Sequence, residues 1–383
     1  MSGDPEQDYF ADGMVEEIIT ALSRIRWLFV IARNSSFTYK GQAVDVKQVG
    51  RELGVCYVLE GSVRKSSRHV RITVQLIDAM TGAHLWAERF DGSLEDVFDL
   101  QDRVAWSVAG VIEPALQAAE TACRANRPTN DLTAYDLYLR ALPNSLSFKK
   151  DAAIQALDLL GRAIECDPRY GPALALAAWW RLQLAANGWT DEEAVNQDKA
   201  VELARQALQV AGDDAGVLAD VAGVLGGFGE DIDFALALID HALELNPSSA
   251  IAWHWSGWLR LSAGEPDLAI EHFKKSLRLD PRSLGLRPFH LTGVGIAHFQ
   301  RRQFEEAGPL LLASLQELPS WVIPYRFLAA CYAHMGRMNE ARETVKRLRA
   351  IMPIVVPETI HWRNPEHREL YLSGLRLAAG EET

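Results

Sequence analysis

Histidine and glutamate side chains near the C-terminal end of the sequence are the first candidates for metal chemistry. His361 and His367 are six positions apart, with Pro365 and Glu366 between them. Imidazole and carboxylate groups are common zinc ligands, but this spacing with an intervening proline matches no common zinc site. We therefore expect these side chains to lie on a surface or in a groove. Three further histidines are interpreted in the same way, as groove or core residues: His290, His298 and His334.

Acidic residues in the N-terminal part of the chain are candidates for acid–base catalysis or for magnesium binding. Asp12 lies near a predicted helix start, and Glu60 and Asp78 lie in predicted strands. Capping, turn and strand-edge positions account for all three carboxylates. The sequence also contains no GxSxG, HExxH or Walker motif. It therefore predicts no catalytic residue, no metal site and no cofactor.

Two glycine-rich stretches could approach a phosphate group: residues 226–229, and Gly293 with Gly295. A phosphate-binding loop joins a strand to a helix, and neither stretch has that setting. We interpret Gly295 instead as the small residue that two closely packed helices require.

Charge and cysteine usage narrow the class of protein. The 383 residues carry a net charge of −12, which argues against nucleic-acid binding by this chain, because that function needs concentrated lysine and arginine. Four scattered cysteines without CxxC pairing are typical of a reducing compartment. No apolar run approaches the ~18 residues of a membrane span, and the acidic N-terminus differs from a signal peptide. We expect a cytoplasmic location, the alternative being the periplasm or attachment to the inner membrane through an upstream segment.

Helical and alternating patterns divide the first 122 residues into an α/β domain. Helical periodicity predicts helices over 9–26, 45–53 and 96–119, and a polar loop over 34–42. The apolar run 27–32 predicts a buried strand. Alternation of apolar and polar residues predicts three more strands over 56–65, 68–78 and 84–90. This order predicts a sheet covered by helices on one side.

Four stretches of this region carry a family resemblance: residues 9–13 (YFADG), 30–37 (VIARNSSF), 53–64 (LGVCYVLEGSVR) and 82–91 (GAHLWAERFD). They resemble the N-terminal α/β domain of TolB-like proteins. The resemblance implies fusion to helical repeats behind a class III adenylate/guanylate cyclase domain or a winged-helix DNA-binding domain. Members usually begin with an apolar strand before a segment like residues 2–5. We therefore expect that the first strand is missing and that the chain is part of a longer protein.

The stretch from Ala250 to Pro281 predicts two short helices joined by a turn at residues 264–266. Gly257 and Ala269 are small enough for the two helix axes to approach closely, with large rings on either side. Pro281 ends the unit, because proline cannot continue a helix. A helix pair of this size cannot bury its own apolar face and must stack on copies of itself.

Copies of this unit recur along the chain. Closing prolines at 168, 247, 281, 319 and 353 are separated by 79, 34, 38 and 34 residues by subtraction, and an alanine precedes each by twelve positions. The sequence resembles the tetratricopeptide repeat, with a weaker unit at 189–211. We predict about six helix pairs over 131–353, a linker over 123–130, and a capping helix and tail over 354–383, with the helix starting at Glu358.

The resemblance implies a concave groove that binds a protein or peptide. Carboxylate-clamp versions of the family have lysine and asparagine at set places, and here none of those places holds either residue, so we expect no clamp. The places hold Val217, Ile251, Phe289, Ile323, Val221, Trp255, Gly293 and Phe327. The groove is predicted to be apolar and aromatic, suited to an amphipathic helix, an apolar peptide or a segment of this chain itself. Its predicted residues are Asp220, Phe228, His254, Trp258, Thr292, Phe299, Arg326 and His334.

Together these patterns predict an α/β domain followed by an all-α solenoid, acting as a non-catalytic regulatory and interaction module. The favoured parent is a bacterial signalling protein such as an adenylate cyclase. Two alternatives stay open: an adenylate or guanylate cyclase that has lost its catalytic domain, and part of a winged-helix transcription regulator. The sequence predicts no oligomeric state.

Overall fold

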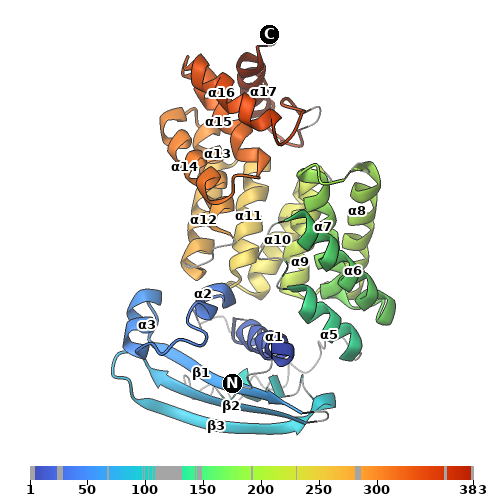
Figure 1. Ribbon diagram of the computed structural model, residues 1–383, viewed down its shortest axis with the longest axis vertical. Coiled ribbons are helices and arrows are strands. Elements are labelled where there is room, and N and C mark those ends of the chain that lie inside the picture. Colours follow the sequence, from blue (N-terminus) through green and yellow to red (C-terminus); the bar gives the residue numbers. More distant parts are fainter. Residues whose placement is uncertain are drawn as a thin grey trace.

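A small antiparallel sheet and a curved stack of helices make up the molecule (Figure 1). The computed structural model describes residues 5–23, 29–66, 69–96, most of 98–107, 132–142, 149–190, 193–229, 231–280, 286–357 and 360–380. The predicted linker over 123–130 and most of the predicted helix over 96–119 lie outside these ranges.

The sheet has three strands in the order β1-β2-β3: β1 (Tyr57–Lys65), β2 (His69–Asp78) and β3 (His84–Ser93). These strands confirm the three alternating segments of the sequence. Val74 of the central strand pairs with Gly61 on one side and with Glu88 on the other. Alternate β2 residues point into the core and are nearly fully buried: Val70, Ile72, Val74 and Leu76.

Helix α1 (Pro5–Ser23) covers the buried face of the sheet (Figure 1). It contributes one apolar side chain per turn to the same core: Phe10, Met14, Ile18 and Leu22. Helix α3 (Val46–Leu53) begins where the Asp45 side chain accepts a hydrogen bond from Lys47 N at 3.0 Å, a helix cap that satisfies a free amide.

The prediction of a strand over 27–32 is wrong for the residues that are described. Phe29 to Ala32 form no strand, and α2 (Arg33–Phe37) follows where a loop was expected. The Ala32 amide donates to the carbonyl oxygen of Leu279 at 2.9 Å, and Ile31 is buried. This apolar run therefore docks on the helical stack instead of joining the sheet.

In the described residues, six helix pairs and a final helix form the stack. Their bounds are α5 (Leu132–Ala141), α6 (Lys150–Cys166), α7 (Gly171–Ala186), α8 (Glu193–Val210), α9 (Ala215–Gly227), α10 (Ile232–Leu245), α11 (Ala250–Ala263), α12 (Pro266–Leu279), α13 (Arg287–Gln300), α14 (Phe304–Glu317), α15 (Val322–His334), α16 (Met338–Arg349) and α17 (Pro365–Ala379). Helices α7, α11 and α13 lie on the inner side of the curve, and α8, α12 and α14 on the outer side (Figure 1).

The final helix packs against α15 and α16 and covers the end of the stack. It starts at Pro365, later than the predicted start at Glu358, because Asn364 provides the cap. The Asn364 side chain accepts from Glu366 N at 2.9 Å. Residues 360–364 before it are irregular.

Glycines set the approach of the paired helices at Gly257 and Gly295, as predicted. A Cβ added at Gly257 would lie 2.6 Å from Phe273 Cε1, and one at Gly295 would lie 3.0 Å from Leu311. Both contacts are with the second helix of the same pair. Gly223 differs, because an added Cβ would lie 2.3 Å from Trp255 on the next first helix. The large Trp255 ring occupies that space, so Gly223 governs packing between neighbouring pairs.

Buried serines join the two helices of a pair at equivalent places. Ser276 Oγ donates to the carbonyl oxygen of Ala250 at 2.7 Å, and Ser314 Oγ donates to that of Pro288 at 2.9 Å. Both serines are fully buried. Each bond ties the last turn of a second helix to the first turn of its partner.

Candidate functional site

An aromatic row, defined as His254, Trp258, Phe289 and Trp321, joins α11, α13 and the residue that precedes α15. The Phe289 and Trp321 rings lie 4.5 Å apart, and the Trp258 and Trp321 rings 6.2 Å apart, centroid to centroid. His254 lies 6.3 Å from Trp258 and 6.2 Å from Phe289. Trp258 and Phe289 are half-buried, while His254 and Trp321 are buried. The row therefore presents two accessible rings on a rigid aromatic base.

The sequence pointed to only part of this row. His254 and Trp258 were predicted as groove residues, and the structure brings them together. Trp321 was missed, because it precedes α15 and falls outside the helical positions used to assign the groove. The sequence signal that could have indicated Trp321 is its place one residue before a first helix.

His254 of the row packs against a second buried histidine, His290. The His254 and His290 rings are 5.1 Å apart, and each side chain is 4% exposed. Burial lowers the pKa of His290 to about 4, and burial followed by the charge of His290 lowers the pKa of His254 well below its ordinary value. Both rings are therefore neutral at physiological pH and belong to an apolar surface, not to a cationic one.

Asp220 lies on the inner side of α9, next to Trp255. The indole Nε1 of Trp255 donates to Asp220 Oδ1 at 3.2 Å. Burial raises the pKa of Asp220 to about 7, although the Trp255 hydrogen bond acts in the opposite direction. This carboxyl can thus change its charge near neutral pH. Phe228, which follows α9, is half-buried and is not part of the aromatic row.

Two predicted groove residues lie inside the stack. Thr292 is fully buried, and its Oγ1 donates to Ser314 Oγ at 2.8 Å. Phe299 is also fully buried and packs 5.4 Å from Phe327. Neither side chain has surface to offer a partner, because both point toward neighbouring helices.

The last two predicted residues contact the C-terminal segment of the same chain. Arg326 Nη2 donates to the carbonyl oxygen of Ile354 at 2.9 Å and lies 3.0 Å from Met352 Sδ. His334 Nε2 donates to the carbonyl oxygen of Leu370 at 2.7 Å. At these two positions, the C-terminal segment of the chain itself takes the place that was predicted for a bound peptide.

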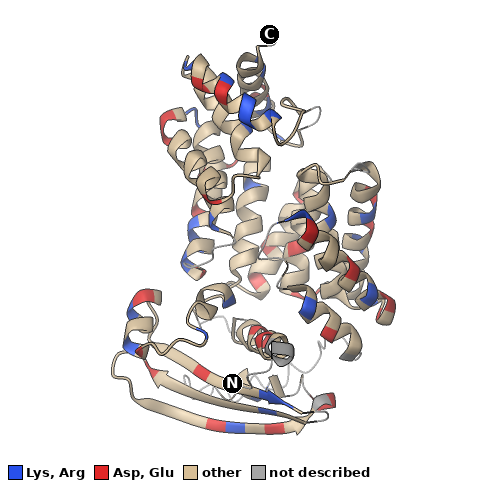
Figure 2. Cartoon of the chain, viewed as in Figure 1, with Lys and Arg blue, Asp and Glu red and all other residues tan. Residues whose placement is uncertain are grey.

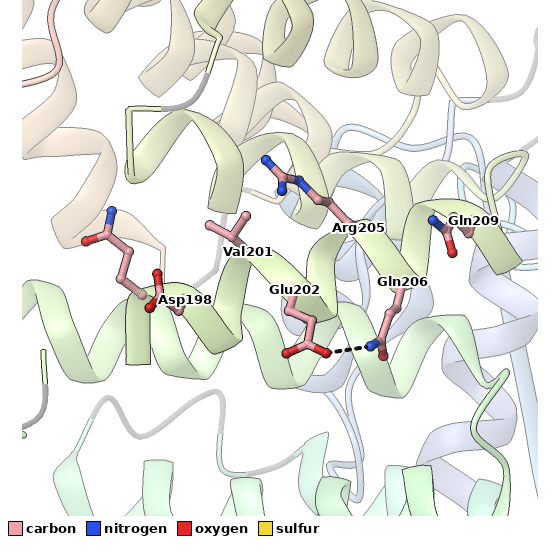
Figure 3. A pocket seen from close by; sticks show the side chains of 7 residues that line it. Asp198, Val201, Glu202, Arg205, Gln206 and Gln209 are labelled. Atoms are coloured by element: carbon pink, nitrogen blue, oxygen red, sulfur yellow. Dashed lines mark hydrogen bonds between the residues drawn. The ribbon is translucent and has the colours of Figure 1, made fainter. Parts of the chain in front are cut away.

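A shallow hollow of about 410 Å³ runs along α8, away from the aromatic row (Figure 3). Its described lining lies on α8 and is polar apart from Val201: Gln197, Asp198, Val201, Glu202, Arg205, Gln206 and Gln209. Gln206 Nε2 donates to Glu202 Oε1 at 3.2 Å. With only one helix supplying these side chains, the hollow lacks the converging groups of a small-molecule site.

Charges are mixed over the helices, with acidic and basic side chains next to each other (Figure 2). Among the described residues, no three histidine, cysteine, aspartate or glutamate side chains are placed to hold a metal ion. None of the helices in the described ranges combines the length and the apolar character that crossing a bilayer requires. His290, His298 and His334 do not come together: His298 contacts Gln303 at 2.8 Å, and His334 contacts Leu370.

Known proteins resemble parts of this chain. "Putative adenylate cyclase 3" of Rhizobium meliloti (strain 1021) is 45% identical over 214 residues, which are 56% of this chain and 36% of that protein. The chain thus spans about a third of the length of that relative.

Two solved structures overlap with larger parts of the chain. The human IFIT1 dimer with m7Gppp-AAAA matches 68% of this chain and 58% of its own, with 16% identity and a TM-score of 0.47. PilW, a type IV pilus biogenesis factor, matches 63% and 99%, with 19% identity and a TM-score of 0.42. Such low scores carry no argument about ligands. The family model for the tetratricopeptide repeat matches residues 250–283, so α11 with α12 is a tetratricopeptide repeat in sequence as well as in structure.

Proposed function

We propose that this chain is a non-catalytic interaction and regulatory module that binds an apolar peptide or a partner protein over the aromatic row. The observation that carries the proposal is the pair of half-buried rings, Trp258 and Phe289, supported from below by buried rings. Large aromatic side chains in rigid surroundings supply most of the energy in protein interfaces. Tetratricopeptide repeats are interaction modules, and an apolar inner side suits apolar anchors of a peptide.

The parent protein belongs to the same proposal. We infer a bacterial signalling protein, with an adenylate cyclase as the favoured parent, because the R. meliloti relative with that name is 45% identical over 214 residues. The resemblance of residues 9–13, 30–37, 53–64 and 82–91 to TolB-like domains supports the same context. A winged-helix regulator is the alternative parent, and a cytoplasmic location is proposed for both.

A library of random 15-residue peptides displayed on phage tests the interaction. Peptides selected on the purified chain are expected to carry large apolar residues and to bind Trp258→Ala or Phe289→Ala at least tenfold more weakly. That loss corresponds to about 1.4 kcal/mol or more, the range of an interface hot spot. The matched control is Phe234→Ala, because Phe234 is 45% exposed on the outer helix α10. Equal binding to all variants would show that the aromatic row is not the site.

The absence of catalysis is tested separately. We expect no cyclic AMP from the purified chain incubated with ATP and magnesium or manganese. If cyclic AMP formation persists after further purification, the chain is an enzyme and the non-catalytic assignment is wrong. The proposal that the aromatic row binds a partner would not be affected.

A further inference from the structure

The described residues between α16 and α17, 351–357 and 360–364, make contacts that a repeat stack does not predict. In such stacks each unit contacts only its neighbours, so the curvature of the stack follows from small rotations between adjacent pairs. This segment leaves the sixth pair after α16 and reaches turns of the second, third and fourth pairs before α17 begins. We call it the clasp.

Three turn glycines mark the path of the clasp. Gly188 after α7, Gly229 after α9 and Gly264 after α11 have φ values of +62°, +77° and +84°. A Cβ added at Gly188 would lie 2.7 Å from Met352 Cε, and one at Gly229 would lie 2.0 Å from His361 Nδ1. At Gly264 it would lie 3.0 Å from Asn364 Cβ. The clasp therefore packs closely against three successive turns.

Polar contacts fix the later half of the clasp to these turns. The Arg363 amide donates to the carbonyl oxygen of Ser262 at 2.8 Å. The Arg363 guanidinium forms an ion pair with Asp233 at the start of α10. The Arg363 and Asp233 side chains are 41% and 76% exposed, so salt can screen this ion pair.

The clasp is also attached to the last pair of the stack. Trp362 stacks on Phe327 of α15, with ring centroids 5.7 Å apart and an interplanar angle of 23°. Arg326 of the same helix holds Met352 and Ile354 through the contacts described above. Val355 is 5% exposed and belongs to the core of the last pairs.

We propose that the clasp is a conformational device that joins the second, third and fourth pairs to the sixth and holds the curved stack closed. The Arg363–Asp233 ion pair is its salt-sensitive fastening, and Trp362 is its apolar anchor. Opening of the clasp separates α8 from α16 while each helix pair stays folded.

Regulation of partner binding follows if the proposed function also holds. The clasp bears on α15, next to the Trp321 end of the aromatic row, so closure sets how much of the inner side a partner can reach. The test below uses no partner, so its failure is independent of any failure of the proposed function.

Energy transfer between two fluorophores measures closure directly. The labels go on Asp198→Cys in α8 and Lys346→Cys in α16, both exposed, with Cys56, Cys123 and Cys166 replaced by serine. Arg363→Asp is expected to lower the transfer efficiency, because it places two carboxylates opposite each other. An exposed ion pair shifts such an equilibrium by up to about fivefold, so a partial opening is expected. The exchange of charges, Asp233→Arg with Arg363→Asp, is expected to restore the efficiency.

Controls separate opening from unfolding. Arg162→Asp makes the same charge change on α6, where Arg162 pairs with Asp158 of its own helix, and is expected to leave the efficiency unchanged. Trp362→Ala is expected to open the stack more fully than Arg363→Asp, with circular dichroism reporting the helix content. Unchanged transfer in both Arg363→Asp and Trp362→Ala, with helix content retained, would overturn the proposal. Failure of the charge exchange to restore transfer would remove the ion pair from it.

Discussion

Single residues decide how closely the two helices of a pair approach. At Gly257, the Phe273 ring occupies the place where a Cβ would be, at 2.6 Å. Phe273 is itself buried among other rings and cannot move aside freely. The glycine is therefore required by packing, not by its backbone angle.

Gly257→Ala is expected to destabilise the protein by about 1–3 kcal/mol through overpacking. The matched control is Gly161→Ala in the middle of α6, where a Cβ would have no neighbour within 4 Å. There the better helix propensity of alanine should raise stability by up to about 1 kcal/mol. Urea unfolding followed by circular dichroism measures both, and equal signs for the two variants would contradict the packing explanation.

Buried histidines make the stability of the fold depend on pH. Because burial lowers the pKa of His290 to about 4, the unfolded chain binds more protons than the folded one between pH 4 and its ordinary value of 6.5. The contribution of His290 to folding stability is therefore fully present above pH 6.5. It is lost as the pH falls, by up to about 3 kcal/mol. His254 contributes with the same sign.

When the pH falls from 7.5 to 5, the variant His290→Leu is expected to lose less stability than the unmodified chain. Asp220 has the opposite sign, because burial raises the pKa of its carboxyl to about 7. Comparing the variant with the unmodified chain at each pH removes the contribution of Asp220, since both proteins keep this residue. Urea midpoints at the two pH values measure the difference, and parallel pH curves would show that His290 titrates normally.

At the scale of elements, the buried serines act as equivalent ties in neighbouring pairs. Ser276→Ala and Ser314→Ala should each cost about 1–2 kcal/mol, because a buried carbonyl oxygen loses its side-chain donor. Ser314 also accepts from Thr292, so its loss should be at least as large. Urea unfolding of the two variants checks this, and a large cost for one with none for the other would deny the equivalence.

The sequence predicted those elements whose signals are local. Spacing of glycine, alanine and proline placed six helix pairs, since each pair is fixed by residues within about forty positions. Alternation placed three strands for the same reason. The strand prediction failed at residues 29–32 because the Ala32 amide bonds to Leu279, which is far away in the sequence. A local pattern cannot predict such a contact.

The candidate site shows the same limit. Counting along each first helix identified His254 and Trp258, but it also assigned Thr292 and Phe299 to the inner surface. Both side chains are fully buried, because Thr292 bonds to Ser314 of α14 and Phe299 packs against Phe327 of α15. Nothing in the spacing of Arg326 and His334 indicated that Met352, Ile354 and Leu370 would contact them.

At the scale of the whole molecule, the described residues of the sheet domain meet the stack in two places: α1 shares a core with α5, and α2 contacts the end of α12. Ser35 Oγ of α2 donates to Asp280 at the end of α12, and Asp280 is 1% exposed. Ser35→Ala and Asp280→Ala in a double-mutant cycle should show a coupling of about 1–2 kcal/mol. Urea unfolding of the four proteins measures the coupling. Additive costs would mean that this contact does not couple the two parts.

The same contact has a consequence for synthesis on the ribosome. Ser35 and Asp280 are 245 residues apart in the chain. At about 5–20 residues per second, the docking face of α2 waits roughly 10–50 s for its partner to emerge. During that interval the apolar residues around Ile31 have no surface to cover them, so the nascent N-terminal domain is a natural client for ribosome-associated chaperones.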